Sequence, residues 1–519
     1  MLVHEPSKRL VLNLSDPARV MTVIPTARQF EFQGKSLVAI PHRIDEVRVL
    51  RNMGFSATPG PIRHHYDWSG QYTPFHAQLE TSEFLTMNPK AFVLNDMGTG
   101  KTLAALWAFD YLRSQGLVNK LLVISPLSTL ERTWADEVFR HFPHLNVSVL
   151  YGTKDRRLKM LAQDADIYLI NHHGIRVIEA ELKARTDLDL VVVDEGAVFR
   201  NASTDLWKSL NRIVTGKPRL WWMTGTPTPN GPTDAWAQCR MVCPERVPKY
   251  FGKFRDSVMR QLGQFKWLPR EGATSMVADA MQPAIRFSRD QCVDLPPAIY
   301  QTRTAPMSTE QTAAYKDMLS KLHMEYQGGA VQAVNEAVKV AKLTQIACGV
   351  VYGANGTEVV LPCKARIDAV LETVEEAATK VIVFVPFKAV LGYVAAELRA
   401  KLGVGKVGVI SGDVPKSMRD DIFASFQSKQ GGIEVLVAIP QAMSHGLTLT
   451  EASTIIWYAP TNSNETYEQA NARITRPGQK HTQFIVHLEG SAVERKAYLR
   501  LQTKGKMQGM LLELVQEEC

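Results

Sequence analysis

The sequence has few cysteines and no long apolar run. Six cysteines in 519 residues are too few for a dense disulfide framework, so we expect reduced thiols. No stretch approaches the roughly 20 uninterrupted apolar residues that a membrane-spanning helix needs, and the first residues lack a basic flank before an apolar segment. These absences argue against a disulfide-stapled secreted domain and a membrane protein. They predict a protein that stays in the cytoplasm.

Internal repeats and low-complexity tracts are also absent. Charged residues make up 22% of the chain and hydrophobic residues 45%, which are ordinary values for a folded globular protein. A chain of this length exceeds what one hydrophobic core usually supports, which predicts two or three domains. The formal net charge of +8 favours an anionic partner without identifying it.

Two sets of short apolar runs alternate with helical patterns, which is typical of parallel sheets with crossover helices. The first set comprises residues 91–94, 121–125, 167–170, 190–193 and 220–224. The second set comprises residues 381–385, 406–410, 434–438, 454–458 and 483–488. We place the boundary between the sets near Pro296, because the pair Pro296-Pro297 cannot continue a helix or a central strand.

The first 70 residues have a different pattern. Residues 9–14, 20–24 and 30–40 are β-prone, and a short helix is predicted over 44–52, ending at Gly54. We therefore expect an α/β protein with three parts. These are a small α+β accessory domain over 1–70, a first lobe over 71–295, and a second lobe with a C-terminal helix over 296–519.

A phosphate-binding loop is predicted at Asn95-Asp-Met-Gly-Thr-Gly-Lys-Thr102, between a buried strand and a helix. Backbone N–H groups around Gly98 and Gly100 would turn toward phosphate oxygens, and the helix N-terminus adds its positive dipole. Lys101 would reach the β and γ phosphates of ATP, and the Thr102 hydroxyl would bind Mg. The predicted nucleotide contacts in the loop are Met97, Gly98, Thr99, Gly100, Lys101 and Thr102.

The apolar run 190–193 ends in two carboxylates, Asp194 and Glu195. Asp194 would hold Mg, while Glu195 would orient and deprotonate the water that attacks the γ-phosphate. Another strand ends in Thr224-Gly-Thr-Pro227, whose small hydroxyl residues suit a sensor of the γ-phosphate. Trp221 and Trp222, just before it, are expected in the core rather than at a base-stacking surface.

Three polar residues of the second lobe share a helical spacing. Gln469, Arg473 and Arg476 are four and three residues apart, which predicts that they lie on one helix face. The guanidinium groups of two arginines can neutralise the charge that develops on a transferring phosphoryl group. If they act on ATP held by the first lobe, hydrolysis requires the two lobes to close and then reopen.

Taken in order, these motifs resemble those of superfamily-two helicases of the Swi/Snf type. Gln78 resembles the glutamine that reads adenine in that family, and 95–102 resembles motif I. The remaining matches are Ser125-Pro126 with Trp134 (motif Ia), 194–197 (the Asp-Glu box), 224–227 (motif III), 444–449 (motif V) and 469–479 (motif VI). The resemblance implies two RecA-like lobes that use ATP and Mg and track along duplex DNA.

The chain departs from the family pattern at several places. Ala197 replaces the usual histidine of the Asp-Glu box, and Thr448 stands where an asparagine is common. The insertions and histone-reading modules of chromatin remodellers are absent, so the chain looks most like compact bacteriophage or bacterial members, which would act in the host cytoplasm if viral. By resemblance, the expected DNA contacts are Ser125, Thr129, Ser444 and Thr448.

The sequence thus predicts an ATP-dependent translocase on double-stranded or forked DNA, acting in replication, recombination or repair. One alternative is a helicase that separates strands of DNA or RNA, which needs a wedge, and no hairpin with an apolar tip is evident. A second alternative is the motor subunit of a nuclease or restriction complex. This would require a partner, because the chain has no paired-carboxylate nuclease motif of its own. The sequence does not identify protein partners.

Overall fold

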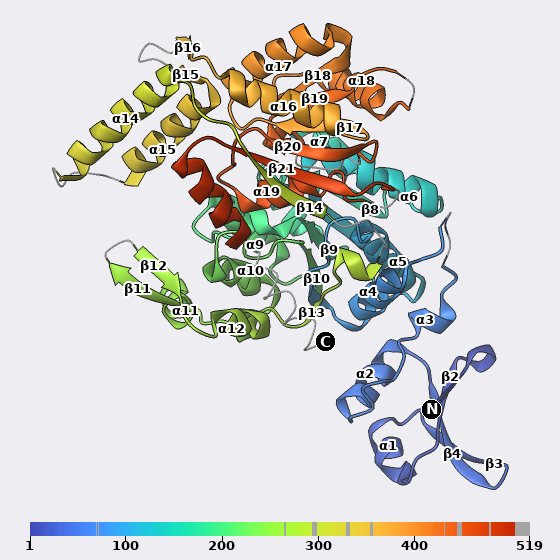
Figure 1. Cartoon of the computed structure of the whole chain (residues 1–519). Helices are drawn as coiled ribbons and strands as arrows, with labels where there is room; N and C mark the ends of the chain where they lie inside the picture. The colour runs from blue at the N-terminus through green and yellow to red at the C-terminus, as the bar shows by residue number, and fades with distance from the viewer. Residues whose placement is uncertain are drawn as a thin grey trace. The chain divides into compact units, whose positions relative to one another are not determined.

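The protein is described by a computed structural model of residues 1–503, leaving out 69, 71, 264–265, 293–297, 328–332, 353–356, 430, 444–448 and 477–478 (Figure 1). Two compact units adjoin in the sequence between Cys292 and Val293. Pro296, near which the sequence places the boundary, lies outside the described residues. No helix within the described part is long and apolar enough to cross a membrane.

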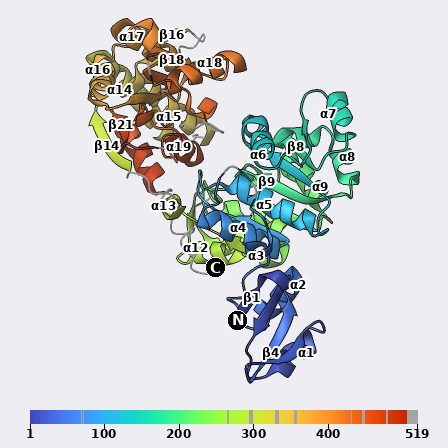
Figure 2. The same cartoon turned by 90° about the vertical axis from the view of Figure 1, so that its right-hand side faces the viewer.

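The first unit begins with a small antiparallel sheet in the order β1-β2-β4-β3. Figures 1 and 2 show helices α1 and α2 on the same side of this sheet. A short helix, α3, follows before the chain enters the larger sheet. The bounds are β1 Leu2–His4, β2 Arg9–Leu12, α1 Pro17–Val23, β3 Arg28–Phe32, β4 Lys35–Pro41, α2 Ile44–Asn52 and α3 Ile62–His65.

Two expectations for this part are corrected. The β-prone segment 20–24 belongs to α1, because Asp16 caps the helix through its Oδ1, which accepts from Ala18 N at 3.1 Å, and Pro17 occupies the first turn. The single run expected over 30–40 is a hairpin, because Gln33 and Gly34 both adopt positive φ (50° and 71°) in a tight turn. The helix predicted over 44–52 is confirmed.

A seven-stranded sheet with all its pairs parallel forms the centre of the first unit, in the order β13-β5-β10-β9-β6-β8-β7. The five predicted strands are present; β7 and β13 were not predicted. The strands are β5 Lys90–Val93, β6 Lys120–Ser125, β7 Val147–Leu150, β8 Ile167–Asn171, β9 Leu188–Asp194, β10 Arg219–Met223 and β13 Ala284–Ile285. The helices are α4 His76–Met87, α5 Lys101–Ser114, α6 Asp136–His141, α7 Lys154–Leu161, α8 Glu179–Ala184, α9 Asp205–Val214, α10 Ala235–Val242, α11 Phe251–Val258, α12 Ala273–Ala280 and α13 Arg289–Cys292.

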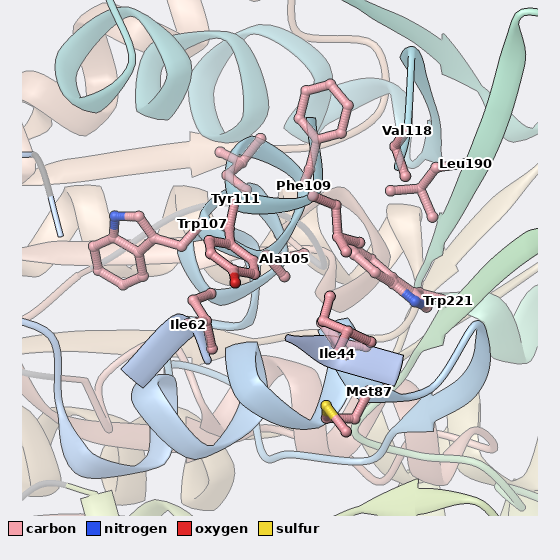
Figure 3. Packing of buried hydrophobic residues seen from close by; sticks show 14 of the residues in the cluster. Ile44, Ile62, Met87, Ala105, Trp107, Phe109, Tyr111, Val118, Leu190 and Trp221 are labelled. Carbon is pink, nitrogen blue, oxygen red and sulfur yellow. The ribbon is translucent and has the colours of Figure 1, made fainter. Parts of the chain in front are cut away.

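The core of the first unit fills both faces of this sheet. Trp221 and Trp222 are fully buried and belong to different clusters, because successive side chains of a strand point to opposite faces. Figure 3 shows Ile44 and Ile62, from the N-terminal segment, in the same cluster as Trp221. The N-terminal segment and the larger sheet therefore share one continuous core.

The second unit contains a six-stranded parallel sheet in the order β14-β21-β20-β17-β19-β18. All five predicted strands are present, and the two parallel sheets confirm the expected fold class. The strands are β14 Ala298–Thr304, β17 Lys380–Phe384, β18 Val407–Ile410, β19 Val435–Ala438, β20 Ala452–Trp457 and β21 Gln483–Glu489. The helices are α14 Thr309–Gln327, α15 Ala333–Cys348, α16 Lys364–Glu376, α17 Lys388–Leu402, α18 Lys416–Gln427 and α19 Asn464–Asn471, and residues 492–503 are also helical.

Two small hairpins complete the described structure. The first, β11 Met259–Gly263 with β12 Lys266–Pro269, belongs to the first unit. The second, β15 Val350–Tyr352 with β16 Glu358–Val360, belongs to the second unit.

A buried ion pair joins α16 to the C-terminal helical segment of the second unit. Arg366 and Glu494 are 2% and 0% exposed, and their nearest nitrogen and oxygen are 2.8 Å apart. Gly490 N donates to Glu494 Oε2 at 2.9 Å, and Arg366 Nη1 donates to the carbonyl of Tyr458. Because neither charge is in contact with water, each depends on the other and on these hydrogen bonds.

We predict that Glu494→Ala strongly destabilises the second unit, because it leaves the buried guanidinium of Arg366 without its carboxylate partner. Removing one partner of a buried pair costs about 3–5 kcal/mol. The control is Asp413→Ala, because Asp413 and its partner Lys388 are 66% and 67% exposed, and exposed pairs contribute at most about 1 kcal/mol. Thermal unfolding followed by circular dichroism measures both, and equal losses in the two variants would contradict the prediction.

Candidate active site

The phosphate loop connects β5 to α5 at the carboxyl edge of the first parallel sheet. Gly98 and Gly100 have φ values of +84° and +76°, which only glycine adopts without strain. Helix α5 begins at Lys101, whose Nζ donates to the carbonyls of Asn95 (2.8 Å) and Asp96 (2.9 Å). Burial lowers the pKa of Lys101, and the neighbouring carboxylates of Glu195, Asp194 and Asp96 oppose this shift. The loop thus places an ammonium group among oxygens where phosphate oxygens can bind.

Asn95 stands where the general phosphate-loop pattern has its first glycine, and its side chain anchors the loop. Its Nδ2 donates to Thr81 Oγ1 on α4, and its Oδ1 accepts from the backbone N of Phe287, both at 2.9 Å. Asn95 is 1% exposed, so both ends of its amide are satisfied inside the protein. A glycine here would lack both hydrogen bonds.

The side chain of Asp96 accepts hydrogen bonds from residues 286–289, close to the boundary of the first unit at Cys292. Its Oδ1 accepts from Arg286 Nη2 at 2.8 Å, and its Oδ2 accepts from the backbone N of Arg289 at 3.0 Å. Arg289 Nε also donates to the carbonyl of Met97 at 3.1 Å. Sequence analysis missed Arg286 and Arg289, because about 190 residues separate them from the loop and no spacing signals such a contact.

Gln78, predicted to read adenine, lies against the phosphate loop. Its Nε2 donates to the carbonyl of Gly100 at 3.3 Å, and its Oε1 accepts from Phe75 N at 2.9 Å. A Cβ added at Gly100 would come within 2.0 Å of Gln78 Nε2, so this contact requires the glycine. Contact with adenine stays a prediction, and it would require the amide to exchange these partners.

The two carboxylates at the end of β9 differ in environment. Asp194 is 7% exposed; its Oδ2 accepts from Trp134 Nε1 at 3.0 Å and its Oδ1 from Glu195 N at 3.0 Å. Burial raises the pKa of Asp194, while the hydrogen bond from Trp134 and the charge of Lys101 oppose this shift. Trp134, matched by resemblance to motif Ia, therefore has a defined role: it positions Asp194.

Glu195 has an unusual backbone for a residue with a side chain. Its φ and ψ are +50° and +49°, in the left-handed region that seldom holds glutamate. The next residue, Gly196, allows the turn, because a Cβ there would lie 2.1 Å from Trp222 Nε1. The chain thus turns sharply directly after the strand and leaves the Glu195 side chain at the sheet edge, half-buried.

The Thr224-Gly-Thr-Pro227 segment packs beside the phosphate loop. A Cβ placed at Gly225 would lie 3.5 Å from the Asn95 carbonyl, so the two segments are adjacent. Thr226 N donates to Thr224 Oγ1 at 3.2 Å, and the buried Thr226 hydroxyl has no hydrogen-bond partner within the described residues. The Thr224-Gly-Thr-Pro227 segment thus places a buried hydroxyl next to the phosphate loop; roles for Thr102 and Asp194 in binding Mg stay predictions.

The predicted DNA-contacting hydroxyls are turned inward. Ser125 and Thr129 are 0% and 8% exposed, and both hydroxyls donate to the carbonyl of Pro126, at 3.5 Å and 2.9 Å. Direct contact with DNA phosphates would require these side chains to change partners. Ser444 and Thr448 lie outside the described residues.

The arginines of the second unit do not lie on one helix face, which corrects the expectation from their spacing. Helix α19 ends at Asn471, whose Oδ1 accepts from Trp457 Nε1 at 2.9 Å, and residues 472–476 form turns and bends. Pro477 disfavours the helical conformation at Arg476 before it, so a helix could not have extended to the second arginine. Only Gln469 is helical; Arg473 is 2% exposed, and Arg476 is half-buried, its Nε donating to Ala472 O at 3.2 Å.

The fold and this site define a P-loop ATPase with two parallel sheets. Residues 83–348 match the SNF2-related domain, and residues 365–478 match the helicase conserved C-terminal domain. The first match covers more than half of the 519 residues, so the chain belongs to the SNF2-related family. This confirms the resemblance to Swi/Snf-type motors and the expected enzyme class, a nucleic-acid-dependent ATPase of the helicase and translocase type that uses ATP.

Three relatives show how widely this architecture is shared. Putative protein p41 of Acyrthosiphon pisum secondary endosymbiont phage 1 is 26% identical over 81% of this chain and 94% of its own length. The ISWI chromatin-remodeling complex ATPase ISW1 of Saccharomyces cerevisiae is 24% identical over 86% of this chain. The putative ATP-dependent helicase/translocase YwqA of Bacillus subtilis is 22% identical over 82%. The match spans only 41% of ISW1 and 46% of YwqA.

We predict that Arg286→Ala weakens ATP binding, because Asp96 loses its charged partner and the loop carbonyls that hold Lys101 lose their fixed position. A hydrogen bond to a charged group contributes about 1.5–3 kcal/mol, so an affinity loss of about tenfold or more is expected. Equilibrium titration with a fluorescent ATP analogue measures it.

The matched control is Arg270→Ala, because Arg270 is an exposed arginine of the same unit, and within the described residues its Nε donates to the carbonyls of Asp256 and Met259. Its affinity for the analogue should equal that of the wild type. Wild-type affinity in Arg286→Ala would show that the loop holds its shape without this contact.

Proposed function

We propose that the chain is an ATP-driven translocase that moves on double-stranded or forked DNA. The observation that carries this proposal is the convergence of Lys101, Asp194 and Glu195 at one sheet edge in a chain of the SNF2-related family. A second parallel α/β unit follows it, with the helicase C-terminal domain, as a two-lobed motor requires. Membership of the family supports the use of ATP, and the residues present fit Mg.

Each group of the site has a separate task in hydrolysis. Lys101 neutralises charge on the β and γ phosphates, and the Thr102 hydroxyl and Asp194 hold Mg, which would polarise the phosphoryl group when bound. Trp134 keeps the Asp194 carboxylate oriented by its 3.0 Å hydrogen bond. Glu195 orients the attacking water and accepts its proton.

The second unit supplies the arginines. Of the two, we assign the transition-state contact to Arg476, because it is half-buried, whereas Arg473 is 2% exposed and part of the core of its own unit. Gln469, also buried, would support the arginines from α19. Because these groups belong to the unit that does not hold the phosphate loop, hydrolysis depends on closure, and product release on reopening.

DNA is the proposed partner for two reasons. Two relatives are described as a helicase/translocase and a chromatin-remodeling ATPase, and the chain carries a formal charge of +8. Contacts to phosphates, for which Ser125, Thr129, Ser444 and Thr448 are the proposed residues, make binding independent of sequence and sensitive to salt. The relative p41, of which 94% is matched, comes from a phage, which supports a compact motor of the phage or bacterial kind. We propose that this motor acts in replication, recombination or repair.

One observation favours strand separation as a second candidate function. The hairpin formed by β11 and β12 exposes Leu262 (54%) and Leu268 (37%), whereas the sequence showed no such hairpin. Exposed apolar side chains on a projecting hairpin could split a duplex. A strand-displacement assay on forked DNA with Leu262→Ser/Leu268→Ser tests this, because loss of displacement with intact DNA-stimulated hydrolysis would identify a wedge.

We predict that blunt or forked duplex DNA strongly stimulates ATP hydrolysis at a fixed salt concentration. Lys101→Ala and Glu195→Gln should each abolish the stimulated rate, because one removes charge neutralisation and the other the proton acceptor. Steady-state phosphate release with no nucleic acid, single strands, blunt duplex, forked duplex and RNA measures this. Stimulation by single strands or RNA alone would contradict translocation on duplex DNA.

Arg476→Ala should leave ATP affinity nearly unchanged but stop hydrolysis, because the guanidinium acts mainly in the transition state. Binding of a fluorescent ATP analogue and phosphate release, measured on the same preparation, separate the two effects. The comparison variant is Arg495→Ala, an exposed arginine of the same unit. Collapse of nucleotide affinity in Arg476→Ala would rule out a role confined to the transition state.

A further inference from the structure

The N-terminal sheet has one covered face and one open face. Leu10, Leu12, Val38 and Ile40 are fully or almost fully buried, in a cluster that includes residues of α1 and α2. Directly paired residues of antiparallel strands lie on the same side of the sheet. The register therefore places a second set on the opposite face: Arg9 and Val11 on β2, Arg28, Phe30 and Phe32 on β3, and Lys35, Leu37 and Ala39 on β4.

The open face carries exposed aromatic rings between basic side chains. Phe30 and Phe32 are 38% and 58% exposed, although burying either ring would be favourable. Phe32 is paired with Lys35, while Arg28 lies two residues before Phe30 on the same side of β3. On this face of the outermost strand, β3, Arg28 is followed by the two rings, and Lys35 of the neighbouring strand β4 lies directly beside Phe32.

No carboxylate projects from this face. The only acidic residue in the four strands is Glu31, which pairs with Ser36 on the covered side. The arrangement thus complements a ligand with flat apolar surfaces and repeated negative charges. Those are the chemical features of unpaired nucleotides.

We propose that this face, defined by Phe30, Phe32, Arg28 and Lys35, binds a single strand of nucleic acid. Side chains two residues apart on a strand are about 7 Å apart, far enough for each ring to stack on its own base. Stacking on aromatic residues of an open sheet holds unpaired bases with little regard to sequence, and the basic side chains pair with the phosphates. A duplex fits less well, because its base faces are already stacked.

The proposal goes beyond the proposed motor function and does not depend on it. None of the residues of the face belongs to the phosphate loop or the acidic pair. If both proposals hold, one chain binds the single-stranded arm of a DNA fork while its motor acts on the adjoining duplex. This would favour forked or gapped DNA over a continuous duplex.

The test uses the full chain and the double variant Phe30→Ala/Phe32→Ala. Removing a stacking side chain weakens binding by roughly tenfold per base, so the affinity for fluorescein-labelled oligothymidine should fall at least tenfold. Fluorescence anisotropy at one fixed salt concentration measures it. The affinity for blunt duplex and the ATPase rate without DNA should both equal those of the wild type.

Three matched variants separate stacking from damage to the fold. Phe30→Tyr/Phe32→Tyr keeps the rings and should bind oligothymidine normally. Met21→Ala/Val23→Ala removes exposed apolar side chains from α1, on the other side of the sheet, and should also bind normally. Arg28→Gln/Lys35→Gln should weaken binding and reduce its logarithmic salt dependence by about 1.4, the value for two phosphate contacts.

An unchanged affinity in the alanine variant, or an equal loss in the Met21 and Val23 control, overturns the proposal. Equal, phenylalanine-dependent binding of oligouridine would show that the face holds single strands whatever their sugar, whereas tenfold weaker binding would restrict it to DNA. If duplex fails to stimulate hydrolysis while oligothymidine binding still depends on the rings, the motor proposal fails and this one stands.

Discussion

The ammonium group of Lys101 is the feature on which the site depends. It donates to loop carbonyls; burial lowers its pKa, and the neighbouring carboxylates of Glu195, Asp194 and Asp96 oppose this shift. Those carbonyls belong to Asn95 and Asp96, and both side chains are anchored elsewhere: Asn95 to Thr81 and Phe287, Asp96 to Arg286. The loop is therefore held by a helix before it in the chain and by a segment almost 200 residues after it.

The charge of Lys101 also acts on Asp194. Asp194 is buried enough for its pKa to rise, and the charge of Lys101 and the hydrogen bond from Trp134 draw it back toward the ionised form. A parallel sheet explains why these groups meet, because β5 and β9 end at the same edge although about 100 residues separate their last residues. Each of the charges on Lys101 and Asp194 therefore opposes the effect of burial on the pKa of the other, which couples the loop to the end of β9.

The sequence predicted what depends on local pattern. Apolar runs identified ten buried strands, and the phosphate loop was recognisable because its glycines and lysine are contiguous. It missed β14, an edge strand with mostly exposed residues and no apolar pattern, and took 20–24 for a strand because β-branched residues outweighed the cap at Asp16. Spacing alone placed Arg473 and Arg476 on a helix that in fact ends before them, at Asn471, and nothing local could reveal Arg286 beside Asp96.

Helix α4 links the N-terminal part to the ATP site by direct contact. Its first half carries Gln78 and Thr81, which bond the phosphate loop, and its second half carries Glu83, which accepts hydrogen bonds from Arg51 and from Gly60 N. A ligand shifts an equilibrium between two states only by the difference in its affinity for them. A nucleic-acid strand bound on the open sheet face can therefore affect hydrolysis through α4 only if it favours one of two arrangements of this helix. Ile44 of α2 and Met87 of α4 belong to one continuous core with the N-terminal sheet, so α4 is the element that packs against that sheet and bonds the phosphate loop at its other end.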